Sequence, residues 1–169
     1  MRDDELRIAG IERESIVDGV GIRYVIFTQG CKHNCYMCHN KLTHDFNGGQ
    51  SIKLIDIYNE IKNLDYLDGV TFSGGDPFFQ AKNCAKLAKM IKEEININVW
   101  AYTGFTFEEI MKYNDKDMLE FMRYIDILVD GRYMHDLRDL SLRFRGSRNQ
   151  RLIDVKESLK VNKVIEIGL

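Results

Sequence analysis

The chain has 169 residues, 44% of them hydrophobic, and a formal net charge of −2 at pH 7. This length supports one sizeable hydrophobic core, so we predict a single domain over residues 1–169, and the near-neutral charge argues against a general attraction to nucleic acid or an acidic membrane. No stretch has the length and hydropathy of a membrane span, and the charged residues 2–5 are unlike a secretion signal, so we expect a cytoplasmic protein with no membrane partner.

Apolar runs alternate with helical patterns along the chain. Four runs predict buried strands, over residues 22–28, 69–73, 97–101 and 125–129. Between them, apolar residues at helical spacing predict helices over 52–64, 78–94 and 107–124. Cys84 falls on the apolar face of the second helix, so we place it in the core and give it no ligand role. This alternation predicts an α/β fold with a parallel sheet and right-handed crossovers, either doubly wound or an incomplete barrel.

The chemically unusual residues follow the predicted strands. Each strand is followed by one such segment, namely 31–38, 73–77, 102–104 and 130–132. The carboxyl ends of parallel strands form the active-site edge in such folds, so we expect these loops to meet. Gly74 and Gly75 taken alone predict an ordinary tight turn, whereas beside the cysteine loop they predict a ligand cradle. Asp130 and Arg132 either form a surface ion pair or hold a zwitterionic or ribosyl ligand, with Arg132 paired to a carboxylate.

Three of the four cysteines, Cys31, Cys35 and Cys38, fall within eight residues. A four-iron cluster normally uses four thiolates, so a loop with three predicts a 4Fe-4S cluster with one open iron. An open coordination position is where a substrate binds, as it is in catalytic zinc sites. The cysteine spacing therefore predicts a cluster that takes part in chemistry rather than one that only carries electrons.

Other interpretations of the cysteines remain open. Zinc would need a fourth ligand, which His33, His39 or His44 could supply, so a zinc-binding or electron-transfer module is the non-enzymatic alternative. The spacing disfavours zinc, because no second cysteine pair follows. A disulfide framework is disfavoured by the odd number of clustered thiols and by the length of the chain.

Several segments together resemble one enzyme family. They are residues 15–23, the cysteine motif, Asn40-Lys41, Ser73 to Pro77, 100–104, 129–133 and 143–151. With them the chain resembles radical S-adenosylmethionine enzymes that activate glycyl radical enzymes. More narrowly, it is similar to the activating proteins of anaerobic (class III) ribonucleoside-triphosphate reductase.

The resemblance implies an incomplete (β/α) barrel with a mainly parallel sheet, of the radical SAM type, with the cluster after the first strand. It implies that the open iron chelates the amino and carboxylate groups of S-adenosylmethionine. The implied cofactor contacts are Gly74 and Gly75 for the amino group, Met37, Cys38 and His39 for adenine, and Thr103, Asp130 and Arg132 for ribose and carboxylate. Many relatives have an aromatic residue where this chain has Met37.

The implied activity is that of an oxidoreductase. An electron from a flavodoxin- or ferredoxin-type donor would reduce the cluster, and cleavage of S-adenosylmethionine would give methionine and a 5′-deoxyadenosyl radical. That radical would take a Cα hydrogen from one glycine of the reductase. No acid–base pair or activated nucleophile is required. The alternatives are an activase of another glycyl radical enzyme, such as pyruvate formate-lyase, and a radical enzyme acting on a small molecule.

A basic cluster lies near the end of the chain, made of Arg143, Arg145, Arg148 and Arg151. Charge runs usually form a solvated face. Phe144 interrupts this one, and Gly146-Ser147 predicts a bend. We therefore expect Arg143 and Arg145 to border the mouth of the site and to help dock the glycine loop of the partner protein.

Overall fold

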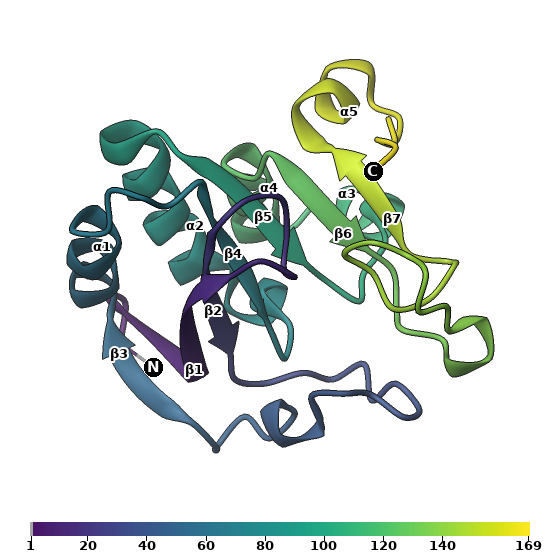
Figure 1. The fold of residues 1–169 in the computed structure, drawn as a ribbon, viewed down its shortest axis with the longest axis horizontal. Helices are drawn as coiled ribbons and strands as arrows, with labels where there is room; N and C mark the ends of the chain where they lie inside the picture. The colour runs from purple at the N-terminus through teal and green to yellow at the C-terminus, as the bar shows by residue number, and fades with distance from the viewer. Residues whose placement is uncertain (1) are drawn as a thin grey trace.

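Seven strands form one mixed sheet in the order β3-β1-β2-β4-β5-β6-β7 (Figure 1). The computed structural model describes residues 2–169. The strands are β1 Glu5–Ser15, β2 Arg23–Thr28, β3 Gln50–Lys53, β4 Gly69–Gly74, β5 Asn98–Tyr102, β6 Ile127–Asp130 and β7 Arg151–Asp154. The central strands β2, β4, β5 and β6 are parallel, whereas β1, β3 and β7 pair antiparallel. Within residues 2–169 the outer strands β3 and β7 do not pair, so the predicted incomplete barrel with a parallel centre is confirmed.

Successive side chains of the central strands point to opposite faces of the sheet. On one face, Val70 and Phe72 of β4 join the main hydrophobic core, and the Phe72 ring packs edge-on against Phe121 at 5.2 Å. On the other face, Trp100 of β5 and Val129 of β6 form a second, smaller apolar cluster. The helices therefore cover one face, and the second face is left for loops.

In the part of the chain that the structure describes, five α-helices accompany the sheet: α1 Leu54–Lys62, α2 Ala81–Met90, α3 Phe107–Tyr113, α4 Lys116–Arg123 and α5 Val155–Val161. A π-helical turn, Ile91–Ile95, extends α2, and short 3-10 turns span Lys41–Thr43, Pro77–Gln80 and His135–Leu137. None of the helices in residues 2–169 has the length and hydropathy of a membrane span.

The observed elements correct several sequence predictions. Strands β1 and β7 were not expected, so the strand that precedes the cysteines is the second of the sheet. Ile52 lies in β3, because that strand continues to Lys53 before α1 begins. The helical region predicted over 107–124 consists of two helices, since Asn114 adopts a left-handed conformation (φ 51°) and Asp115 caps a new N-terminus. Cys84 is fully buried in α2, as predicted.

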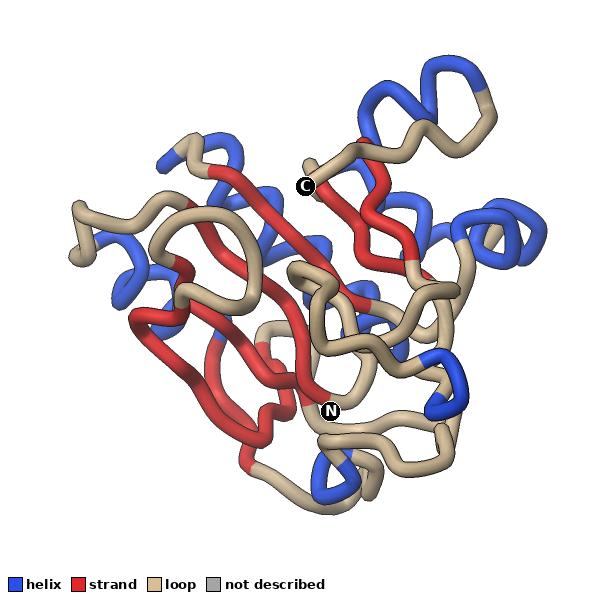
Figure 2. Tube along the Cα trace, turned by 45° about the vertical axis from the view of Figure 1, so that its right-hand side comes forward, coloured by secondary structure: helices blue, strands red, loops and turns tan. Residues whose placement is uncertain are grey.

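The loops after the central strands gather at one end of the sheet, drawn as tan tube in Figure 2. They are the segments that follow β2, β4, β5 and β6. Parallel strands place their carboxyl ends at the same edge, so residues far apart in sequence become neighbours there. The fold thus brings the predicted site segments to one place.

Candidate functional site

A cavity of about 620 Å³ opens at this edge of the sheet. Most of the residues predicted for the site line this cavity. Those that do are Cys31, Cys35, Cys38, His39, Gly74, Gly75, Thr103, Arg143 and Arg145. Three predicted residues, Met37, Asp130 and Arg132, do not line it. Its volume falls in the range of about 300–1,000 Å³ that is usual for ligand sites. The cavity can therefore hold a ligand next to the cysteines.

The cysteine loop is closed by hydrogen bonds to its own far end. The backbone N–H of Gly30 donates to the carbonyl of Thr43 at 2.7 Å, and that of Cys31 donates to His44 at 3.2 Å. The side-chain amide of Gln29 donates to the carbonyl oxygens of Leu42 and Asp45, at 3.0 and 2.7 Å. These bonds hold both ends of the loop against the end of β2.

Inside the loop, two residues have left-handed backbone, Asn34 with φ 49° and Met37 with φ 57°. The N–H of Cys38 donates to the carbonyl of Cys35 at 3.2 Å, which makes a tight turn between the second and third cysteines. These bends turn all three cysteines to the same cavity. They leave the side chain of Met37 49% exposed and outside the cavity lining.

The three thiols are free and partly buried. Burial raises the pKa of Cys31 to about 11, and burial also raises the pKa of Cys35. At neutral pH the Cys31 thiol is therefore protonated in the metal-free chain. Because the thiolate is the ligand form, metal binding at this loop must release protons.

The donor set fits a cluster better than a zinc ion. Tetrahedral zinc, with Zn–S distances of about 2.3 Å, needs sulfur atoms about 3.8 Å apart. In residues 2–169, no three histidine, cysteine or acidic side chains are arranged to hold a single ion. His33, one candidate for a fourth zinc ligand, instead directs its Nε2 atom to Asp76. A cluster distributes its thiolates over several metal ions, which suits three half-buried sulfur atoms around one cavity.

The paired glycines lie where chain segments approach closely. Gly74 has φ +98°, and a Cβ atom there would lie 2.4 Å from the backbone nitrogen of Thr28. A Cβ atom on Gly75 would meet the carbonyl oxygens of Gly30 and Thr43 at 2.5 and 2.8 Å. The need for glycine is therefore explained by contact with β2 and the cysteine loop. The same two residues also line the cavity, where they offer backbone groups without side chains.

Thr103 is buried at the end of β5 and uses its hydroxyl within the protein. The Oγ1 atom donates to Asp76 at 2.8 Å and accepts from the N–H of Phe105 at 3.1 Å. The residue lines the cavity, as predicted. Its predicted contact with ribose stays a prediction. The hydroxyl already donates its proton to Asp76, so toward a ligand it could act only as an acceptor.

Asp130 and Arg132 do not pair with each other. Asp130 is fully buried and accepts from two nitrogens of Arg151, at 3.0 and 2.6 Å, and from the N–H of Phe107 at 2.8 Å. Arg132 is exposed and pairs with Glu109 at 3.2 Å. Both line a neighbouring cavity of about 580 Å³. Their predicted contacts with ribose and carboxylate stay predictions. Both side chains already have charged partners within the protein.

The Asp130–Arg151 pair gives a test of stability. Hydrogen bonds from Arg151 raise its pKa above the usual value, the bond to Asp130 having the largest effect and the bond to Glu108 the next largest. Arg151→Gln leaves a buried carboxylate without its cation, so we expect unfolding free energy in urea to fall by about 3–5 kcal/mol. The matched control, Arg132→Gln, breaks an exposed pair and should cost less than about 1 kcal/mol. Equal losses in the two variants would contradict this assignment.

Further cavity residues were not predicted from the sequence. Ile16, Val17 and Asp18 reach the cavity from the loop before β2, and Tyr133 and Phe144 reach it from the loops after β6. The only sequence signal for the first group was the resemblance of residues 15–23 to the activase segment. Tyr133 and Phe144 fall in the similar segments 129–133 and 143–151, but no spacing rule indicated them, because those loops meet the cysteines only through the fold.

Arg145 is partly buried in the cavity lining, and its predicted role in docking stays a prediction. Its Nη1 atom donates to the carbonyl of Gln150 at 2.9 Å, and its Nε atom is buried without a hydrogen-bond partner. Arg143 is exposed, with its guanidinium 4.9 Å from the centre of the Phe144 ring. The two arginines therefore differ: Arg143 lies at the rim of the cavity and Arg145 in its wall.

Comparison with known proteins identifies the class of this fold and site. Residues 17–153 match the family of 4Fe-4S single cluster domains. The matched range includes the cysteine loop and runs to β7, so the chain belongs to this class of iron–sulfur proteins.

Relatives define the family more closely. The anaerobic ribonucleoside-triphosphate reductase-activating protein of Enterobacteria phage T4 is 33% identical over 141 residues, covering 80% of this chain and 86% of the phage protein. The protein of the same name from Escherichia coli (strain K12) is 34% identical over 142 residues, covering 80% and 90%. The chain belongs to the family of anaerobic ribonucleoside-triphosphate reductase-activating proteins, and the resemblance seen in the sequence is confirmed. Among solved structures, QueE from Escherichia coli matches with a TM-score of 0.43 and 17% identity, over 60% of this chain and 53% of QueE.

Proposed function

We propose that this chain activates anaerobic ribonucleoside-triphosphate reductase by generating a glycyl radical on it, with a 4Fe-4S cluster and S-adenosylmethionine as cofactors. One observation carries the proposal: three free thiols from a single loop line one cavity together with Gly74 and Gly75. Membership of the activase family supplies the reductase as the protein substrate.

Cys31, Cys35 and Cys38 would hold the cluster. Three thiolates on a four-iron cluster leave one iron for the amino and carboxylate groups of S-adenosylmethionine. When bound, the cluster supplies the electron that cleaves S-adenosylmethionine to methionine and a 5′-deoxyadenosyl radical. The protein contributes orientation and exclusion of water, since the reactive chemistry belongs to the cofactors.

The residues that line the cavity support contacts to each part of S-adenosylmethionine. Backbone groups of Gly74 and Gly75 would contact the amino group, and His39 with the backbone at Met37 and Cys38 would border adenine. Because Met37 is exposed and lies outside the cavity lining, a contact through its backbone does not need an aromatic side chain there. The unpartnered Nε of Arg145 makes it a better candidate for the carboxylate than Arg132, which pairs with Glu109.

The open mouth of the cavity suits a protein substrate. Ile16 and Val17 are 73% and 71% exposed at its edge, and Arg143 stands on the opposite loop. An extended glycine-containing segment of the reductase would enter between them. An electron donor of the flavodoxin or ferredoxin type would reduce the cluster.

A direct test combines the anaerobically reconstituted protein with S-adenosylmethionine, a reductant and its reductase. We expect a glycyl radical signal in the electron paramagnetic resonance spectrum of the reductase and a matching amount of 5′-deoxyadenosine. A well-loaded protein that forms no 5′-deoxyadenosine would contradict the proposal. A radical on pyruvate formate-lyase instead of the reductase would identify a different activase.

A further inference from the structure

Asp76 points into the protein and not into the cavity. It belongs to the segment Ser73 to Pro77, yet it is only 1% exposed and is absent from the cavity lining. Its Oδ2 atom accepts three hydrogen bonds, from His33 Nε2 at 2.7 Å, Thr103 Oγ1 at 2.8 Å and Gly104 N at 2.9 Å. Its Oδ1 atom accepts from the N–H of Phe78 at 2.9 Å. One carboxylate therefore joins the cysteine loop to the ends of β4 and β5.

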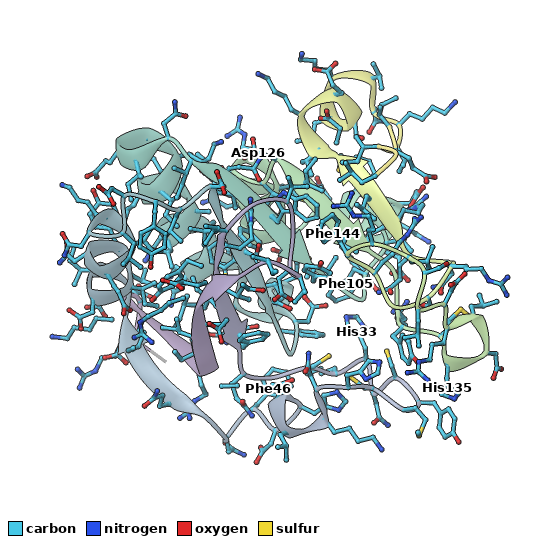
Figure 3. The ribbon with its side chains drawn as sticks, viewed as in Figure 1. His33, Phe46, Phe105, Asp126, His135 and Phe144 are labelled. Atoms are coloured by element: carbon cyan, nitrogen blue, oxygen red, sulfur yellow. The ribbon has the colours of Figure 1, made fainter. Side chains whose placement is uncertain are left out.

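The cysteine loop contributes His33 to this arrangement. His33 lies between Cys31 and Cys35 in sequence, and its side chain is 5% exposed. Its ring packs against Phe105 at 4.5 Å and Phe79 at 5.4 Å, and Figure 3 shows it beside Phe105. Because a carboxylate only accepts, Nε2 of His33 is the donor in the bond to Asp76. Packing against these two rings restrains the His33 ring.

Two further features link the position of the His33 ring to the first cysteine, Cys31. A Cβ atom on Gly104 would come within 2.4 Å of the His33 ring, so the end of β5 closes over the ring directly. His33 follows Cys31 by two residues, so the position of its ring restrains the backbone beside that cysteine. A change at Asp76 or in the ring would therefore disturb the position of Cys31.

We propose that Asp76 and His33 are positioning residues, whose hydrogen bond holds the cysteine loop in the geometry that receives the cluster. This inference rests on the proposed function. It gives the acidic residue of the Gly74-Gly75-Asp76 segment a role towards the metal site that differs from ligand contact. Removing a group that hydrogen-bonds to and orients a metal ligand typically lowers metal affinity or activity by about 10–100-fold.

The test compares four variants, reconstituted anaerobically with iron and sulfide. His33→Phe keeps an aromatic ring and removes the donor, His33→Gln keeps a donor at a similar place, and Asp76→Asn removes the charge. His135→Phe is the matched control, because His135 contacts Tyr36 and Tyr133 but no carboxylate. The readouts are the half-life of the cluster against an iron chelator, the electron paramagnetic resonance spectrum of the reduced cluster and its midpoint potential.

We expect His33→Phe and Asp76→Asn each to shorten the cluster half-life about tenfold or more and to change the spectrum. His33→Gln should recover most of the loss, and His135→Phe should match the wild type. Combining His33→Phe with Asp76→Asn should add little, because both act on the same contact: one removes its donor and the other the charge on its acceptor. Asp76→Asn should also raise the midpoint potential, since a buried negative charge near the cluster disfavours its reduction.

Wild-type half-lives and spectra in both single variants would overturn the inference. So would a lower melting temperature with an unchanged spectrum of the loaded protein, because that result describes a purely structural role. If Asp76→Asn fails to fold, equal behaviour of His33→Phe and His33→Gln still overturns it. A wild-type chain that takes up no four-iron cluster would overturn the proposed function itself, and this inference with it.

Discussion

Replacing any one of Cys31, Cys35 and Cys38 by serine should lower the formation of 5′-deoxyadenosine at least about 100-fold. Loss of a group that only supports a metal ligand lowers metal affinity or activity by up to about 100-fold, and loss of a thiolate ligand itself has a larger effect. Each variant leaves two thiolates on the loop, which cannot retain a four-iron cluster of this kind. Iron and sulfide content per chain, together with 5′-deoxyadenosine measured after reduction, checks the result.

The fourth cysteine provides the matched control. Cys84 is fully buried in α2, and burial raises the pKa of its thiol well above the usual value. Cys84→Ala should keep full iron content and cleavage activity while lowering stability by about 1 kcal/mol, the effect of a small core cavity. Loss of the cluster in Cys84→Ala, or normal activity in a loop variant, would contradict the three-thiolate assignment.

Arg145→Ala and Arg143→Ala should separate cofactor binding from partner docking. Arg145 lines the cavity wall with an unpartnered Nε, so its loss should weaken S-adenosylmethionine binding about 10–100-fold, the effect of one charge-assisted hydrogen bond. Both uncoupled cleavage and reductase activation should fall in this variant. Arg143 is exposed at the rim, so Arg143→Ala should reduce activation of the reductase and leave uncoupled cleavage unchanged.

Arg148→Ala is the control for the basic run. Arg148 is exposed and does not line the cavity, so neither rate should change. The measurements are the Kd for S-adenosylmethionine, the rate of 5′-deoxyadenosine formation and the yield of glycyl radical. An equal pattern of losses in Arg143→Ala and Arg145→Ala would contradict the division between rim and wall.

The centre of the fold follows from the sequence, and its edges do not. Strands β2, β4, β5 and β6 were predictable because they are apolar runs between helical patterns. Strand β1 was missed because only one of its faces is covered: Leu6 and Ile8 are buried, whereas the remainder is largely exposed or intermediate. Strand β7 is four residues long and follows the arginine-rich segment, so its local pattern is weak.

The sequence predicted the cysteine ligands of the site but not the hydrogen bonds that hold the surrounding loops. Spacing alone singled out Cys31, Cys35 and Cys38, because three clustered thiols are chemically unusual. The partners of Asp76 and Asp130 were not predictable, because His33 and Arg151 reach them from segments that are 43 and 21 positions away. Residue type does not indicate depth within the basic run, since Arg143 and Arg145 have the same charge and only the fold separates the rim of the cavity from its wall.

The most direct test of the central claim uses S-adenosylmethionine labelled in its amino nitrogen and carboxylate oxygen, bound to the reduced protein. Electron–nuclear double resonance would detect coupling between the cluster and each labelled atom. The three-thiolate site predicts coupling to both labels, because one iron lacks a protein ligand. Absence of both couplings in a protein that holds a four-iron cluster and binds S-adenosylmethionine would contradict an open iron at this site.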